Sequence, residues 1–161
     1  MDLGGYQPGC LADIVGLHAR YYARNWDFGL AFEAKVAAEL AEFLNRMDQE
    51  RDLFLVAYEG GSVVGSIVVD VTGGGSQGAH LRWFIVAAQG VGLGKTLLGR
   101  AMQFCDAQGC GSVWLTTFAG LDAARTLYAR HGFALAGEAE VDQWKGGVRE
   151  QVFVRPAPMQ R

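Results

Sequence analysis

The sequence lacks the features that mark several large classes of protein. It has only 3 cysteines, and this odd, sparse set argues against a disulfide framework. We interpret Cys10, Cys105 and Cys110 as small buried hydrophobic residues in a reducing compartment. No run of about 18 apolar residues occurs, which argues against a transmembrane helix. The first nine residues show neither a basic nor an apolar leader segment, so we expect a cytoplasmic protein with no membrane partner.

Positive charge is not in excess either. The 161 residues carry 14 Lys and Arg against 17 Asp and Glu, a net charge of −3, which argues against a nucleic-acid partner. Half of the residues are hydrophobic and 19% are charged, so the chain is not a disordered tail. Its length fits one domain over residues 1–161.

Glycine, by contrast, is abundant. The 23 glycines are about twice the average usage, so the backbone must make many tight turns or approach something closely. Periodicity predicts helices over 10–24 and 28–46, over a stretch ending near 109, and over 123–131. It predicts strands over 52–58, 63–72, 80–87, 112–118, 133–139 and 148–155, with a hairpin turn at 59–62 and a long hairpin loop at 73–78. The order is mixed α/β, with strand–helix crossovers only in the second half.

The most informative segment runs from Gln89 to Thr96 and reads Gln-Gly-Val-Gly-Leu-Gly-Lys-Thr. It follows a predicted strand and opens a helix, where unpaired N–H groups bind phosphate. A nucleotide P-loop needs glycine at Gln89, and a dinucleotide fingerprint needs glycine at Leu97, so each fails by one position. A tight strand–helix turn without a ligand is the remaining alternative.

The pattern Gln89-x-x-Gly92-x-Gly94 resembles the pyrophosphate loop of the GNAT acyltransferase family. Downstream, Leu127-Tyr128-x-x-x-Gly132-Phe133 is similar to the Leu-Tyr-x-x-x-Gly-Phe motif of that family, about 40 residues after the loop. The stretches 81–86, 114–133, 142–144 and 150–154 further resemble GNAT domains fused to MarR-type winged-helix regulators, although this chain has no room for the DNA-binding part. The resemblance implies the GNAT fold, a mixed and mostly antiparallel sheet of six or seven strands flanked by about four helices.

The resemblance also implies an N-acetyltransferase that moves an acetyl group from acetyl-CoA to a primary amine of a small molecule or peptide. The transfer would be direct, in a ternary complex, and would use no metal. Backbone N–H groups of the loop would hold the pyrophosphate, the main chain of the strand before it would pair with the pantetheine arm, and Lys95 or Arg100 could meet a phosphate. The implied coenzyme-binding residues are Phe84, Ile85, Val86, Gln89, Gly90, Val91, Gly92, Leu93, Gly94, Lys95, Thr96 and Tyr128.

Two residues are the predicted catalytic pair. Tyr128 matches the family's general acid, because a phenol with a pKa near 10 can give a proton to a leaving thiolate. His80 is the candidate base, because an imidazole titrates near 6.5 and strand alternation places it on one face with Arg82 and Phe84. A backbone N–H near Ile85 would stabilise the oxyanion.

The acceptor pocket is expected between the early helices, the later strands and the last hairpin. Its predicted lining residues are Arg82, Trp26, Glu33 and Trp144, with Tyr21, Tyr22, Phe28 and Asp142 as further candidates. Aromatic rings mixed with carboxylates suit a cationic amine. A non-catalytic acyl-CoA-binding sensor is the alternative to the enzyme. A hydrophobic strand edge is compatible with a homodimer.

Overall fold

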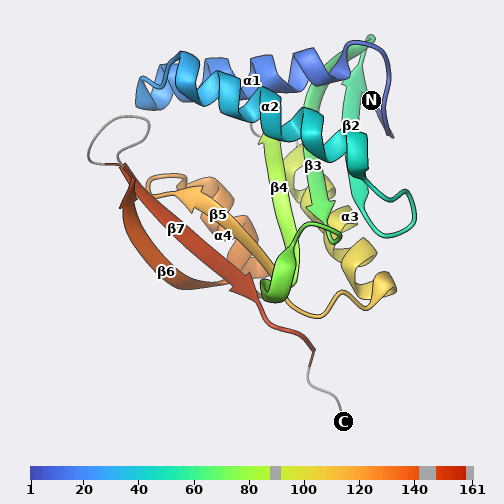
Figure 1. Ribbon diagram of the computed structural model, residues 1–161, viewed down its shortest axis with the longest axis vertical. Coiled ribbons are helices and arrows are strands. Elements are labelled where there is room, and N and C mark those ends of the chain that lie inside the picture. The colour runs from blue at the N-terminus through green and yellow to red at the C-terminus, as the bar shows by residue number, and fades with distance from the viewer. Residues whose placement is uncertain (88–91, 142–147, 159–161) are drawn as a thin grey trace.

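A mixed β-sheet forms the centre of the fold (Figure 1). The computed structural model describes residues 1–87, 92–141 and 148–158. In these residues the sheet has seven strands in the order β1-β2-β3-β4-β5-β7-β6. The strands are β1 (Asp2–Gly4), β2 (Leu53–Glu59), β3 (Ser62–Asp70), β4 (Ala79–Val86), β5 (Val113–Phe118), β6 (Ala134–Val141) and β7 (Val148–Arg155). Among the described pairs β4 and β5 are parallel, and the other neighbours are antiparallel.

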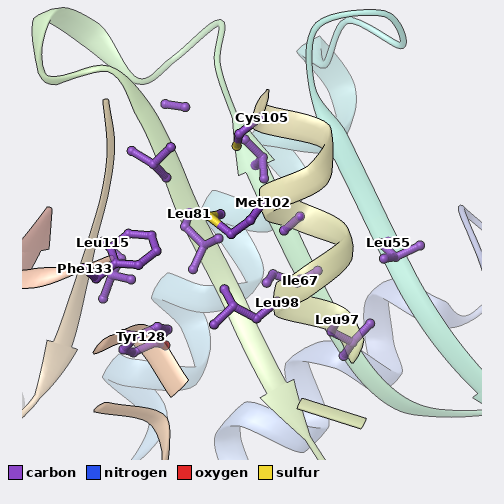
Figure 2. Close-up of a cluster of buried hydrophobic side chains, with 14 of the residues drawn as sticks. Leu55, Ile67, Leu81, Leu97, Leu98, Met102, Cys105, Leu115, Tyr128 and Phe133 are labelled. Atoms are coloured by element: carbon purple, nitrogen blue, oxygen red, sulfur yellow. The ribbon is translucent and has the colours of Figure 1, made fainter. Parts of the chain in front are cut away.

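Helices cover both faces of the sheet. Helices α1 (Cys10–Trp26) and α2 (Leu30–Arg46) lie on one face, and α3 (Leu93–Gln108) and α4 (Asp122–Arg130) lie on the other (Figure 1). Along β2, Phe54 and Val56 pack toward α1 and α2, whereas Leu55 and Ala57 pack toward α3. Because both faces are buried, the central strands are continuous apolar runs. Figure 2 shows the cluster on the α3 side.

The predicted architecture is confirmed. The boundaries predicted for the strands agree with the structure within two residues, as do those of α1 and α2. Strand β1 was not predicted, because three residues are too few to show alternation, and its place depends on the pairing of Leu3 with Ala57 of β2. Within the described part of the chain, no helix is long and apolar enough to cross a membrane.

The glycine-rich loop at 73–78 packs closely against the start of β5. A Cβ on Gly78 would lie 2.3 Å from the carbonyl oxygen of Ser112, and a Cβ on Gly74 would lie 2.0 Å from the carbonyl oxygen of Gly78. The indole Nε1 of Trp114 donates hydrogen bonds to the carbonyls of Gly74 (3.3 Å) and Gly78 (3.2 Å). Close packing therefore explains these two glycines.

Strands β4 and β5 pair only at their first residues. The register joins Ala79 to Val113 and His80 to Trp114, and it ends there. Beyond that point β5 continues to pair with β7, so the two halves of the sheet separate (Figure 1). From Leu81 onward, the β4 edge that faces β5 has no strand partner in the residues described. The candidate site lies where β4 and β5 diverge.

Candidate active site

A cavity of about 490 Å³ lies where β4 and β5 separate. Its walls come from both strands, from α1 and α2 on one side, from α4 and the start of α3 on the other, and from β7. The lining residues are His18, Tyr21, Tyr22, Phe32, Lys35, Val36, Glu39, His80, Leu81, Arg82, Trp83, Phe84, Ile85, Val86, Gly94, Trp114, Leu115, Thr116, Thr117, Phe118, Leu121, Ala123, Ala124, Leu127, Tyr128 and Glu150. A volume of this size is typical of a small-molecule site.

A β-bulge in β4 shapes this cavity. Trp83 has a φ of 45°, and the β3–β4 register shifts between Ser66 and Val68. The hydroxyl of Ser66 donates a 2.7 Å hydrogen bond to the carbonyl of Trp83. The extra residue reverses the alternation of side chains along the strand. Phe84 therefore packs with the core on the α3 side, and the prediction that it shares a face with Arg82 is wrong.

One end of the cavity is the N-terminus of α3. Gly92 precedes the helix with a φ of 75°, and the first backbone bond of the helix runs from the N–H of Thr96 to the carbonyl of Gly92. The N–H groups of Leu93, Gly94 and Lys95 therefore have no backbone acceptor in the described part of the chain. Open N–H groups at the positive end of a helix dipole suit an anion such as a pyrophosphate.

The side chains at the start of α3 differ in whether a ligand can reach them. The side chain of Leu93 is buried in the core, so only its main chain can bind a ligand, and the Thr96 hydroxyl donates to the Gly92 carbonyl at 3.1 Å. Lys95 and Arg100 are exposed. Gln89, Gly90 and Val91, which were predicted to bind the coenzyme, lie outside the described residues.

Gly94 brings α3 close to the cavity wall. A Cβ at this position would lie 3.3 Å from Cδ1 of Leu127 and 3.5 Å from Cζ of Phe84. All three residues line the cavity. The missing side chain therefore lets the helix start approach both α4 and β4, and keeps the space between them open.

Tyr128 of α4 lies at the junction of the cavity and the core. It is 5% exposed, and its ring centroid is 6.0 Å from that of Phe84 and 5.8 Å from that of Phe133. Figure 2 shows it near Phe133 and Leu115. Burial, and to a smaller extent the proximity of Tyr22, raises the pKa of Tyr128 above its ordinary value. A phenol is protonated at physiological pH even with its ordinary pKa, so Tyr128 can serve as a hydrogen-bond donor.

His80 lines the cavity where β4 and β5 pair, apart from Tyr128. Its ring stacks on Trp114, with centroids 3.6 Å apart and planes 9° from parallel. At about 3.3 Å per residue, it is about 13 Å along β4 from Phe84, the residue that contacts Tyr128. Burial, with a contribution from the Arg82 charge, lowers the pKa of His80 to about 3. Such an imidazole is a weak proton acceptor, and its role as the base stays a prediction.

Arg82 is held in an ion-pair network. Its guanidinium lies 3.1 Å from Glu39 of α2 and 3.4 Å from Asp70 of β3, and it stacks over the Trp83 ring at 4.0 Å. Arg46 approaches the same Asp70 carboxylate at 2.6 Å. Arg82 lines the cavity, and its charge is already paired with two carboxylates of the protein. Its role in binding the acceptor stays a prediction.

Aromatic rings form the wall on the α1 side. Tyr21, Tyr22 and Phe118 line the cavity, and Tyr22 packs edge-on against Phe118 with centroids 5.6 Å apart. The other predicted acceptor residues that the structure describes do not line it. Trp26 packs behind this wall on Tyr22 at 5.5 Å, Phe28 is buried, and Glu33 is exposed in the first turn of α2. Trp144 and Asp142 lie outside the described residues.

Several polar residues that line the cavity were not predicted as site residues, among them His18 and Glu150. His18 lies in α1 with its Nδ1 2.8 Å from the carbonyl of Ile14, and burial lowers its pKa to about 4. Glu150 of β7 lies opposite Phe118 in the β5–β7 register. Helical periodicity marked His18 only as part of an apolar face, and nothing in the sequence relates Glu150 to the helices across the cavity.

Metal ligands are not gathered in the described residues. No group of three or more His, Cys, Asp or Glu side chains could hold an ion in residues 1–87, 92–141 and 148–158.

The amino-acid sequence matches a known protein family over most of its length. Residues 17–133 match the sequence model of the acetyltransferase (GNAT) family. This match covers well over half of the chain. The chain belongs to the GNAT acetyltransferase family. No curated protein sequence matches it at a significant level. The narrower resemblance to GNAT domains fused to MarR-type regulators stays a prediction.

Solved structures show the same fold over nearly the whole chain. An acetyltransferase from Streptococcus agalactiae is 23% identical, with a TM-score of 0.71 and coverage of 96% of this chain and 97% of that one. A ribosomal-protein-alanine N-acetyltransferase from Brucella melitensis is 17% identical, with a TM-score of 0.72 and coverage of 97% and 99%. An acetyltransferase from Salmonella typhimurium, solved with its cofactor acetyl-CoA, is 16% identical, with a TM-score of 0.72 and coverage of 100% and 96%. At these sequence identities, the likeness shows a shared fold and nothing more.

Proposed function

We propose that this GNAT chain is an N-acetyltransferase that transfers the acetyl group of acetyl-CoA directly to a primary amine in a ternary complex. The observation that carries the proposal is the cavity between β4 and β5, which joins a helix start with open N–H groups to the buried phenol of Tyr128. Family membership and the acetyl-CoA-bound Salmonella relative support acetyl-CoA as the donor.

The coenzyme end would use main-chain groups. The open N–H groups at the start of α3 suit the pyrophosphate, and the β4 edge that has no strand partner among the described residues suits the amide groups of a pantetheine arm. Acetyl-CoA supplies an activated thioester whose carbonyl carbon is open to attack by an amine. A backbone N–H near Ile85 or Val86 would donate to the carbonyl oxygen as negative charge develops there.

Tyr128 would protonate the leaving sulfur of the coenzyme. A phenol is protonated at neutral pH, and burial raises the pKa of this one further. It can therefore donate a hydrogen bond and then a proton to the thiolate as the carbon–sulfur bond breaks. The neighbouring rings of Phe84 and Phe133 hold it in a fixed orientation. The family assignment of general acid and this geometry therefore agree in supporting the same role.

The acceptor amine would enter from the aromatic and charged end. Glu39 and Arg82 neutralise one another there, whereas Glu150 has no ion-pair partner in the described part of the chain. A carboxylate in this position would attract an ammonium group and accept its proton, directly or through water. With a pKa of about 3, His80 is weakly suited to that step. We therefore add Glu150 to His80 as a candidate base.

Calorimetric titration with acetyl-CoA, followed by a thiol-release assay on the same sample with a panel of primary amines, tests the proposal. Binding together with release supports the enzyme. Binding without release for any amine overturns catalysis and favours the acyl-CoA-binding sensor. Absence of binding overturns the proposed coenzyme site.

A further inference from the structure

His18 is a buried polar side chain that lines the cavity. It is 6% exposed, and its only hydrogen bond among the described residues joins Nδ1 to the Ile14 carbonyl at 2.8 Å. A carbonyl oxygen can only accept, so Nδ1 must carry the hydrogen. Nε2 is then an acceptor in a neutral ring, and no partner of Nε2 is found among the residues described. Buried polar atoms without a partner are rare in native proteins and call for an explanation.

The surroundings keep this imidazole neutral. Burial lowers the pKa of His18 to about 4, and the hydrogen bond to Ile14 opposes this shift only in part. The charged groups that line the cavity are Lys35, Glu39, Arg82 and Glu150. Glu39 lies 3.7 Å from Lys35 and 3.1 Å from Arg82, so its charge is compensated without His18. At neutral pH, Nε2 therefore accepts a hydrogen bond and cannot donate one.

We propose that Nε2 of His18 accepts a hydrogen bond from a second polar group of the acceptor, so that the preferred substrates are primary amines that also carry a hydroxyl or amino group. This inference rests on the proposed function and adds the substrate class. A site that leaves a buried acceptor unpaired discriminates against an analogue that lacks the matching donor. A carboxylate on the acceptor would face a lone pair and would be disfavoured.

Matched pairs of acceptors isolate this contact. Amino alcohols of three to five carbons are compared with alkylamines of the same length, so that each pair differs by a neutral hydroxyl and interactions of the ammonium group cancel. The wild-type protein is expected to favour at least one amino alcohol in kcat/KM. His18→Leu should reduce that preference by about tenfold to 100-fold, mainly through KM, and His18→Gln should retain part of it because its amide oxygen still accepts.

His131→Gln is the control, because His131 lies at the end of α4 and does not line the cavity. It should leave the preference unchanged. An equal preference in wild type and in a folded His18→Leu variant would overturn the proposal. Calorimetry with acetyl-CoA and a thermal melt establish that each variant is folded and binds the donor.

A measurement on the wild-type protein remains decisive if His18→Leu does not fold. The ¹⁵N shift of the unprotonated Nε2 should move when an amino alcohol is added in the presence of coenzyme A, and it should stay in place with the matched alkylamine. Equal shifts with both would overturn the inference. Because this readout needs binding only, absence of turnover would reject the proposed function without deciding the role of His18.

Discussion

The two ends of the cavity are built in different ways. At the end proposed to bind the coenzyme, α3 and α4 approach through a glycine and apolar side chains, with Gly94 against Leu127 and Phe84, and Tyr128 places a buried hydroxyl there. At the acceptor end, α2 is joined to the sheet through charges, with Arg82 between Glu39 and Asp70. Close packing fixes the shape of the first end, and ion pairs fix the second. Substitutions at the two ends should therefore affect different properties of the protein.

The largest effect is expected at Tyr128. Tyr128→Phe should lower turnover by about 10²–10⁴-fold, because a positioned acid at the leaving group is lost. The affinity for acetyl-CoA should change by less than about threefold, since the ring and its packing remain. Thiol release and calorimetry measure the two quantities separately.

Tyr58→Phe provides a matched control for this test. It removes a hydroxyl that donates to the Gly5 carbonyl at 2.6 Å and does not line the cavity. Its turnover should equal that of the wild type. Unchanged turnover in Tyr128→Phe would remove Tyr128 from the mechanism.

The second prediction concerns the charges behind the acceptor end. Asp70 is fully buried, and Asp70→Asn should lower the free energy of unfolding by about 1.5–3 kcal/mol, because hydrogen bonds from Arg46 to a charged acceptor are weakened. Glu42→Gln removes an exposed partner of the same Arg46 and should cost at most about 0.5 kcal/mol. Urea unfolding of both variants makes this comparison, and equal losses would contradict it.

The dependence on pH follows from the ionisation of Asp70. Burial opposes ionisation, but hydrogen bonds from Arg46 and from the N–H of Gly73 more than offset it, so the pKa of Asp70 is lowered. The stabilisation is therefore complete above the unfolded pKa of about 3.9 and is lost as pH falls through the lower folded value. The difference between wild type and Asp70→Asn should shrink below about pH 4. A stability difference that stays constant on further acidification would contradict this assignment.

The third prediction tests packing at the coenzyme end. Gly94→Leu should weaken acetyl-CoA binding by about tenfold or more, because its side chain must occupy the space between Leu127 and Phe84. Gly99→Leu in the same helix is the control, since a Cβ there meets no atom within 4 Å. Calorimetry on both variants is the measurement. Equal affinities would show that this space is not used by the coenzyme.

The same contrast explains what could be predicted from the sequence. The coenzyme end is made of short contiguous motifs, so Gly92, Gly94 and Tyr128 could be assigned from their spacing and family resemblance, and their roles stay predictions. The long apolar strands and helices were predicted because each buries a regular face. The three-residue β1 was not, because it depends on pairing with β2.

The acceptor end could be predicted only in part. His18, Glu39, Arg82 and Glu150 come from α1, α2, β4 and β7, and no local pattern relates them. The bulge at Trp83 also breaks the alternation on which the face of Phe84 was predicted. Trp26 and Glu33 were plausible by residue type, but the packing of α1 and α2 leaves them outside the cavity lining.

The smallest predicted effect concerns the electrostatic attraction of the substrate by Glu150 at the acceptor end, considered apart from its candidate role as the base. If it attracts the substrate ammonium, Glu150→Gln should raise KM for amines by about twofold to fivefold, because a half-buried carboxylate contributes at most about 1 kcal/mol to an ion pair. The wild-type KM should rise with salt, and that of the variant should rise less. Glu138→Gln on neighbouring β6, whose carboxylate pairs with Arg149 and does not line the cavity, should leave KM and its salt dependence unchanged. Attraction alone leaves turnover unchanged. A fall in turnover of about 100-fold or more would support the second role proposed for Glu150, as the base that takes the amine proton, and the acceptor end would then share in proton transfer as well as in binding.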